Sequence, residues 1–299
     1  MRLLLQFPEG LKAQALEKAR EYEEQGHEVF ISSAPCFGAC DLALEEAKAV
    51  KADKIIHFGH SEFTDSPVPV EYIEYPMDVK YDAVMKKALK KLKKYKRIGL
   101  LTTVQHVHQI PELREALEKA GKQVKLGKGR LAKYEGQVLG CDAGAASSIA
   151  DGVDAFLYFG GGEFHPGGVN VEKPLLIANP FSKAVEWFDL KRNEKFRKGR
   201  LTRALLAKTF GILVSTKAGQ FNVEIAQEAK RKIEEQGKRA EILVSNYIDF
   251  DALQNFRSFD AYINTACPRL RDDQERAKAP VLNMDDLAEL LKLLDSKAQ

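Results

Sequence analysis

Hydrophobic residues recur along the chain in an order that appears three times. In the first occurrence, a short apolar run is followed by a helical pattern and three further apolar runs. This pattern predicts a helix at 11–26, which ends at Gly26, and strands at 3–7, 27–32, 54–59 and 70–75. Strands that alternate with helices are typical of an α/β domain with a mostly parallel sheet.

The same order returns from Arg97 and again from Thr209. The second occurrence predicts a helix at 111–121 and strands at 97–103, 123–126, 155–160 and 174–180. The third predicts a helix at 222–237 and strands at 209–215, 239–245, 261–266 and 279–284. Two helices end in the same E-E-Q-G, and each third strand is preceded by a hydrophobic residue and an aspartate: Asp53, Asp154 and Asp260.

These repeats predict an α/β fold of three related domains, each a small four-stranded, mostly parallel sheet flanked by helices. The expected domains are 1–96, 97–204 and 205–299. Their boundaries fall near a lysine-rich segment at 86–96 and a basic connector at 191–200. Ligands of open α/β sheets bind beyond the carboxyl ends of the strands. We therefore expect the chemistry where the three domains present those ends to one another.

Composition narrows the class of protein. Hydrophobic residues make up 44% of the 299 residues and charged residues 30%, which is the mix of a soluble globular protein. The N-terminal apolar run is short and meets Pro8, so it indicates a first strand rather than a signal peptide, and we expect a cytoplasmic protein.

The net charge of +3 does not indicate a nucleic-acid binder. We interpret the basic run at 86–97 as a solvated helix face, with a docking patch for an acidic partner as the alternative.

The four cysteines are Cys36, Cys40, Cys141 and Cys267. Scattered cysteines are commonly plain buried residues, but three of these follow predicted strands at their carboxyl ends. Cys40 and Cys141 follow the second strands of the first two units and open helices, and Cys267 follows the third strand of the third unit. One cysteine from each domain would supply three thiolates to a [4Fe–4S] cluster at the domain junction and leave one iron open to substrate.

Local spacing does not by itself identify a metal site. The C-x-x-x-C at 36–40 lacks the third cysteine of the usual radical S-adenosylmethionine signature, because position 43 is Ala43. We find no C-x-x-C motif and no Cys/His cluster along the sequence, which argues against zinc. His57 and His60 flank a predicted strand, and we interpret them as structural.

Four segments carry a family resemblance that spans essentially the whole chain. They are C-F-G-A-C-D at 36–41, G-C-D-A-G at 140–144, A-K-T-F-G-I-L-V at 207–214 and A-C-P-R at 266–269. With these the chain resembles archaeal diphthamide synthase subunit 2, in the 2-(3-amino-3-carboxypropyl)histidine synthase family. The resemblance implies that Cys40, Cys141 and Cys267 hold the cluster and that Cys36 is a bystander near it.

The resemblance also implies a transferase that acts in the first step of diphthamide biosynthesis. In that family a reduced cluster donates an electron to S-adenosylmethionine and the Cγ–S bond breaks. The resulting 3-amino-3-carboxypropyl radical adds to C2 of a histidine imidazole in translation elongation factor 2. The implied partners are elongation factor 2, an unidentified electron donor and a second copy of the chain in a homodimer. Neither a membrane nor a nucleic acid is expected.

Polar residues and glycines after the predicted strands are candidates for contact with S-adenosylmethionine. Short polar side chains can bind its carboxylate, amine or ribose, and an arginine can pair with the carboxylate. The candidates are Thr103, Gln105, His106, Gly161, Gly162, His165, Ser215, Gln220 and Arg269. The alternative for each is a structural role, such as loop capping. No catalytic residue is expected beyond the cluster, and Trp187 is expected in the core.

Two other functions fit parts of the pattern. Repeated α/β domains without a metal could form a non-catalytic binding module for a sugar or nucleotide. An electron-transfer iron–sulfur protein would hold a cluster without cleaving S-adenosylmethionine. Iron content separates the first alternative from the enzyme, and only a turnover assay separates the second.

Overall fold

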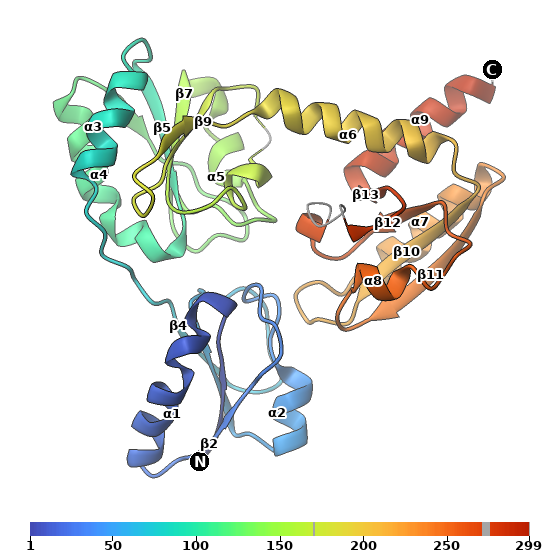
Figure 1. The fold of residues 1–299 in the computed structure, drawn as a ribbon, viewed down its shortest axis with the longest axis horizontal. Coiled ribbons are helices and arrows are strands. Elements are labelled where there is room, and N and C mark those ends of the chain that lie inside the picture. The colour runs from blue at the N-terminus through green and yellow to red at the C-terminus, as the bar shows by residue number, and fades with distance from the viewer. Residues whose placement is uncertain (170, 271–275, 299) are drawn as a thin grey trace. The chain divides into compact units, whose positions relative to one another are not determined.

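The computed structural model describes residues 1–169, 171–270 and 276–298, which form three mostly parallel sheets (Figure 1). The strand orders are β2-β1-β3-β4, β6-β5-β7-β8-β9 and β11-β10-β12-β13. The same order of second, first, third and fourth strand thus appears three times. The predicted α/β class, with three related sheets flanked by helices, is confirmed.

The strands of the first sheet are β1 (Arg2–Gln6), β2 (Glu28–Ile31), β3 (Lys54–Phe58) and β4 (Val70–Ile73). Those of the second are β5 (Arg97–Thr102), β6 (Gln123–Lys125), β7 (Ala155–Phe159), β8 (Leu175–Ala178) and β9 (Val185–Trp187). Those of the third are β10 (Thr209–Ser215), β11 (Arg239–Ser245), β12 (Ala261–Asn264) and β13 (Val281–Asn283). The α-helices are α1 (Ala15–Glu24), α2 (Leu44–Val50), α3 (Asp82–Lys91), α4 (Ile110–Lys119), α5 (Gly144–Ser147), α6 (Leu190–Leu205), α7 (Val223–Glu235), α8 (Phe250–Leu253) and α9 (Met284–Ala298).

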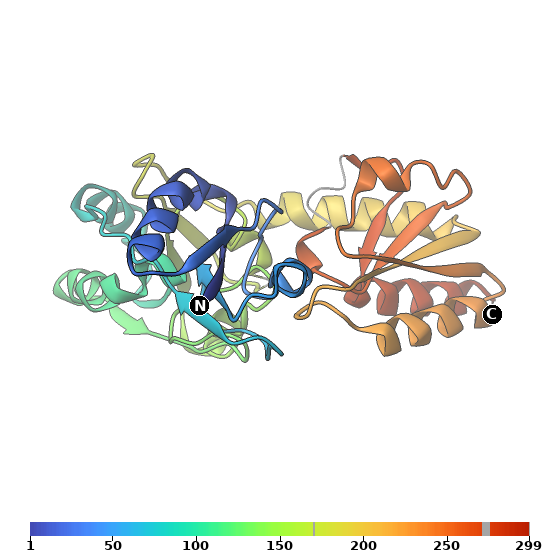
Figure 2. The ribbon, with the colours of Figure 1, turned by 90° about the horizontal axis from the view of Figure 1, so that it is seen from below.

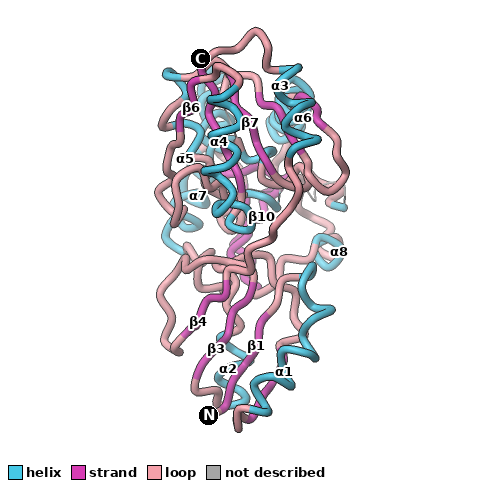
Figure 3. The backbone as a smooth tube through the Cα atoms, turned by 90° about the vertical axis from the view of Figure 1, so that its left-hand side faces the viewer, coloured by secondary structure: helices cyan, strands magenta, loops and turns pink. Residues whose placement is uncertain are grey.

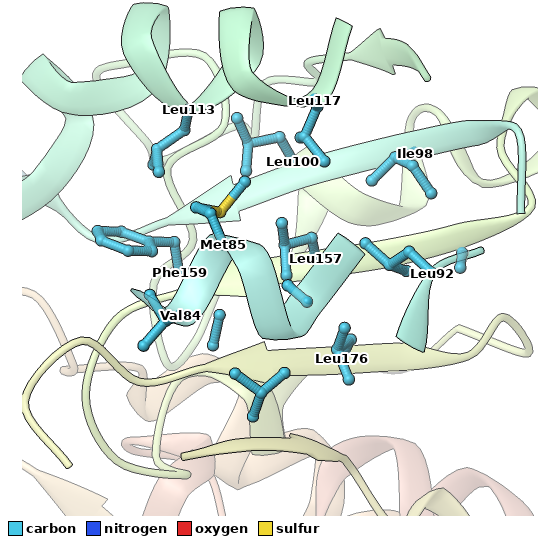
Figure 4. Close-up of a cluster of buried hydrophobic side chains, with 14 of the residues drawn as sticks. Val84, Met85, Leu92, Ile98, Leu100, Leu113, Leu117, Leu157, Phe159 and Leu176 are labelled. Carbon is cyan, nitrogen blue, oxygen red and sulfur yellow. The ribbon is translucent and has the colours of Figure 1, made fainter. Parts of the chain in front are cut away.

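Alternating side chains of each sheet pack against helices on its two faces. In the first sheet, whose strands run parallel in Figure 3, Leu3 and Leu5 face α1 while Leu4 faces α2. In the second, Leu157 of β7 packs with α3 and α4, as Figure 4 shows, and Phe156 packs on the opposite face. In the third, α7 and α9 lie along one face (Figure 2). Burial on both faces explains why the inner strands β7 and β10 are apolar over almost their whole length.

The repeated aspartate connects the third strand of each unit to the first. Asp53 accepts a hydrogen bond from the backbone N–H of Arg2 at 2.7 Å. Asp154 accepts one from Arg97 at 2.8 Å, and Asp260 accepts one from Thr209 at 3.0 Å. Each carboxylate therefore satisfies a backbone donor where the first strand begins, which gives the sequence repeat a physical reason.

The contribution of Asp154 to stability should depend on pH. The Arg97 side chain, helped by backbone N–H groups, lowers the pKa of Asp154 to about 2, against about 3.9 for an unfolded aspartate. Because the folded pKa is depressed, the stabilisation is complete above the unfolded pKa and is lost as the pH falls towards 2. We expect the difference in unfolding free energy between wild type and Asp154→Asn, measured in urea, to shrink between about pH 5 and pH 2.

The control for this measurement is Asp151→Asn, a nearby surface substitution without the Arg97 partner. Its difference from wild type should not follow the same pH profile. A wild-type advantage over Asp154→Asn that is constant from pH 7 to pH 2 would contradict the role assigned to the carboxylate.

Several local expectations were wrong. The second sheet has a fifth strand, β9, which pairs antiparallel with β8 and carries Trp187. This tryptophan is 39% exposed instead of belonging to the core, because β9 is an edge strand. The basic connector is helical and forms α6, where the Asp189 side chain accepts the N–H of Arg192 and caps the first turn. Cys40 and Cys141 lie in turns that precede α2 and α5 instead of opening them.

The chain divides into two compact units, Met1–Phe188 and Asp189–Gln299. The first unit contains the first two sheets, and the second contains α6 and the third sheet. The finer partition at 96 and 204 stays a prediction. Within the residues that the structure describes, no helix is both long enough and apolar enough to span a bilayer.

Candidate metal centre

The loop that carries Cys40 is attached to the carboxyl end of the first sheet by Gln6, the last residue of β1. The buried Gln6 amide donates from Nε2 to the carbonyl of Asp41 at 2.5 Å, and its Oε1 accepts the N–H of Ala43 at 3.1 Å. The backbone turns between Gly38 and Asp41, whose N–H bonds to the Gly38 carbonyl at 3.0 Å. Cys40 lies in this turn and is partly exposed.

The loop that carries Cys141 is built around the carboxylate of Asp142. Leu139 and Asp142 exchange two backbone hydrogen bonds, of 3.0 and 3.2 Å, so Cys141 lies at the tip of a tight turn and is exposed. The carboxylate accepts the N–H of Leu131 at 2.6 Å and that of Gly144 at 2.8 Å. A Cβ atom at Gly144 would lie 2.8 Å from Asp142 Oδ1, which explains the glycine in G-C-D-A-G.

The loop that carries Cys267 is attached by two buried asparagines at the ends of neighbouring strands. Asn264, at the end of β12, donates from Nδ2 to the carbonyl of Cys267 at 2.7 Å. Asn283, at the end of β13, donates to the carbonyl of Pro268 at 2.9 Å and accepts from Asn264 at 2.9 Å. Cys267 itself is partly exposed.

Each of these three thiols thus lies in a loop held by buried or charged polar groups beyond the carboxyl end of a strand. They are accessible to a ligand, whereas Cys36 is only 2% exposed. Three accessible thiols are a donor set that fits an iron–sulfur cluster. Cys40 and Cys141 belong to the N-terminal unit and Cys267 to the C-terminal unit.

Six of the predicted substrate contacts follow strands of the second sheet. Thr103, Gln105 and His106 come after β5, and the other three, Gly161, Gly162 and His165, come after β7. Gln105 donates from Nε2 to the carbonyl of Gly59 at 2.8 Å.

His106 is buried and held within the protein. Its Nδ1 lies 3.1 Å from the carbonyl of Met77, and its ring stands edge-on to Phe159 with centroids 5.4 Å apart. Burial lowers the pKa of His106, so the imidazole is neutral at pH 7. In the glycine loop, Gly162 has φ of 68°, a conformation that favours glycine, and the ring of His165 meets Phe164 edge-on.

The other three predicted contacts belong to the C-terminal unit. Ser215 Oγ lies 3.3 Å from the carbonyl of Asn246 and accepts the N–H of Lys217 at 3.2 Å. Gln220 closes the turn that follows β10, and the buried Arg269 lies two residues after Cys267. The two hydrogen bonds of Ser215 give this residue a structural role. Whether any of the nine residues binds substrate stays a prediction.

The structure also brings together a group that sequence spacing did not reveal. Cys36, His57 and His60 each place one potential ligand atom within 4.8 Å of the others. Burial, with the neighbouring His60, lowers the pKa of His57 to about 3, so its imidazole is neutral. The expectation that the chain has no Cys/His cluster was wrong. Cys36 lies in the loop after β2 and the two histidines lie in or directly after β3, so their spacing along the sequence does not form a motif. In the sequence, the H-x-x-H motif at 57–60 was the feature that pointed to this group.

Known proteins resemble the chain over almost its whole length. A family model described as "Putative diphthamide synthesis protein" matches residues 7–298. The chain is 37% identical to the 2-(3-amino-3-carboxypropyl)histidine synthase of Pyrococcus horikoshii, over 98% of this chain and 86% of that protein. It is 28% identical to the synthase of the same name from Methanocaldococcus jannaschii, over 97% of this chain and 84% of that protein.

A solved structure agrees with these sequence matches. It is the crystal structure of Dph2 from Pyrococcus horikoshii with a 4Fe-4S cluster. It matches with a TM-score of 0.91 and 35% identity, over 98% of this chain and 86% of that chain. By sequence and by fold, the chain belongs to the diphthamide synthesis protein family.

Proposed function

We propose that this protein is a 2-(3-amino-3-carboxypropyl)histidine synthase that transfers the 3-amino-3-carboxypropyl group of S-adenosylmethionine to C2 of a histidine imidazole in translation elongation factor 2. The observation that carries the proposal is the set of three accessible cysteines. Each lies in a firmly held loop beyond the carboxyl end of a strand, in a different sheet. The similarity to synthases of this name supports the same reaction.

In this proposal Cys40, Cys141 and Cys267 hold a [4Fe–4S] cluster as thiolates. When bound, the cluster supplies the electron that breaks the Cγ–S bond of S-adenosylmethionine. Gln6, Asp142 and the asparagine pair keep the three thiols in fixed loops, so that little conformational freedom is lost when the cluster binds. Buried polar supports of this kind are the usual way to position ligands.

In this proposal, the predicted contacts other than Ser215 bind and orient the substrate. Arg269 is the group best suited to the carboxylate of the transferred fragment, because guanidinium pairs with carboxylate through two parallel hydrogen bonds. The loop at 160–162 would line the site without adding charge next to the sulfonium. We further propose a cytoplasmic homodimer that receives electrons from a separate donor protein.

Turnover of the reconstituted protein tests this function. Anaerobic protein with iron and sulfide, dithionite, S-adenosylmethionine and elongation factor 2 should yield 5′-methylthioadenosine and a modified histidine. The product is decisive because cleavage at Cγ–S leaves the methylthio group on the nucleoside. Formation of 5′-deoxyadenosine would show that another bond breaks. A protein that binds the cluster and leaves S-adenosylmethionine intact would be an electron carrier.

A further inference from the structure

The group formed by Cys36, His57 and His60 lies in the first sheet's half of the N-terminal unit. Cys36 comes from the loop after β2, His57 from within β3 and His60 from the segment directly after it. Parallel pairing of β1 with both β2 and β3 brings these segments to the same end of the sheet. Cys36 and His57 are almost fully buried, at 2% and 0% exposure, and His60 is partly exposed.

The hydrogen bonds of Gln6 set the proton position on His57. The Gln6 amide donates to the Asp41 carbonyl and its Oε1 accepts the N–H of Ala43, so Oε1 is the atom that faces His57 Nδ1 at 2.9 Å. An oxygen can only accept, and His57 Nδ1 therefore carries the proton. The lone pair of His57 is on Nε2, which lies 3.0 Å from Nδ1 of His60. A buried imidazole oriented by a carbonyl oxygen on its far nitrogen is the typical arrangement of a metal-binding histidine.

We propose that Cys36, His57 and His60 form a site for a single divalent transition metal ion of the zinc type, separate from the three cysteines that hold the cluster. One thiolate and two imidazole nitrogens are ligands that zinc prefers, and three protein ligands leave a fourth position open. The proposal concerns metal binding alone and holds whether or not the chain is a transferase.

The distances suit this ion with small movements. Zinc bond lengths of about 2.05 Å to nitrogen and 2.3 Å to sulfur, in tetrahedral geometry, place two nitrogens about 3.3 Å apart and nitrogen and sulfur about 3.6 Å apart. The two nitrogens are 3.0 Å apart, and all three ligand atoms lie within 4.8 Å of one another. A shift of about 1 Å in the Cys36 loop completes the set.

Binding has a defined proton balance. The thiol of Cys36 becomes a thiolate and releases one proton. His60 transfers its proton from Nδ1 to Nε2 and frees Nδ1 for the metal, without a net change. Binding therefore releases one proton per ion, as metal binding by a thiol requires. Because Gln6 contacts both His57 and the loop that contains Cys40, the metal also stiffens the support of one cluster ligand.

Metal analysis of the full-length protein tests the proposal. The reconstituted wild type, incubated with Zn²⁺ and desalted, should retain one zinc per chain in addition to the iron of its cluster. Cys36→Ser and His60→Asn should each lose the zinc and keep the iron. The control is His108→Asn, which replaces an exposed histidine paired with Asp78 and should keep both metals.

A second measurement removes the cluster ligands. The chain with serine at positions 40, 141 and 267 should bind one Co²⁺ with the charge-transfer absorption of a cobalt thiolate. Adding Cys36→Ser should remove that absorption. Gln6→Met should weaken Co²⁺ binding about 10–100-fold, the usual effect of losing a group that orients a ligand. Calorimetry in buffers of different ionisation enthalpy should report one proton released per ion.

Two results would overturn the proposal. One is the absence of Co²⁺ binding in the folded triple-serine chain, with folding checked by far-UV circular dichroism. The other is zinc retention that is unchanged in both Cys36→Ser and His60→Asn. Because His60 is partly exposed, His60→Asn keeps the test decisive even if replacement of the buried Cys36 prevents folding.

Discussion

Replacing any one of Cys40, Cys141 and Cys267 by alanine is expected to abolish the [4Fe–4S] cluster, whereas Cys36→Ala keeps it. A cluster held by three protein thiolates already has one iron without a cysteine ligand. Loss of one of the three thiolates exposes a second iron to solvent. Cys141 is exposed and Cys40 and Cys267 are partly exposed, so removal of any one thiol creates no core cavity, and the apo-protein should stay within about 0.5 kcal/mol of wild type. Iron and sulfide content after anaerobic reconstitution measures the loss.

Cys36→Ala is the matched control, because it removes a thiol from the same loop as Cys40. Its thiol is buried, so we expect a stability loss of about 1 kcal/mol together with full cluster content. A Cys141→Ala protein with the iron and sulfide of wild type would exclude a site shared by the three sheets. In that case the cluster would have to be held by ligands that do not include Cys141.

The second large effect is expected from Asp142, which never touches the cluster in this proposal. Asp142→Ala removes the two side-chain hydrogen bonds that tie the Cys141 loop to Leu131 and Gly144, and bonds to a charged acceptor are worth about 1.5–3 kcal/mol each. The thiol of Cys141 remains, but its turn is then held only by the backbone hydrogen bonds between Leu139 and Asp142. We therefore expect most of the cluster absorbance to be lost, while the apo-protein keeps the far-UV circular dichroism of wild type.

A graded series makes this test sharper. Asp142→Asn keeps one acceptor oxygen and should retain an intermediate amount of cluster. Asp151→Ala, a surface aspartate in the same unit, should behave as wild type. Hydrogen exchange in the apo-protein should rise at 139–144 in Asp142→Ala and remain unchanged elsewhere. Full cluster content in Asp142→Ala would show that the turn at Leu139–Asp142 holds Cys141 without the carboxylate.

The sequence alone was sufficient for most of the fold. Strands β10 and β11 begin and end where their apolar runs predicted. The run of β10 is unmistakable because this strand lies inside a parallel sheet and is buried on both faces. The aspartate before each third strand could be identified in the sequence, although its hydrogen bond to the backbone of the first strand could not. The placement of Cys40, Cys141 and Cys267 beyond strands also followed from the order of elements, since position along a strand is local information.

The tertiary structure decided what depends on side chains that meet from distant segments. Gln6 carried no signal in the sequence, yet it supports both the Cys40 loop and His57, because β1 is paired between β2 and β3. Periodicity also missed β9, whose three residues gain their strand conformation by pairing with β8. In the group of Cys36, His57 and His60, the cysteine is 21 or more positions away from the histidines in sequence. Spacing along the sequence therefore did not show that these side chains lie close together. Local patterns determine elements, whereas a site forms only when the pairing of strands brings its residues together.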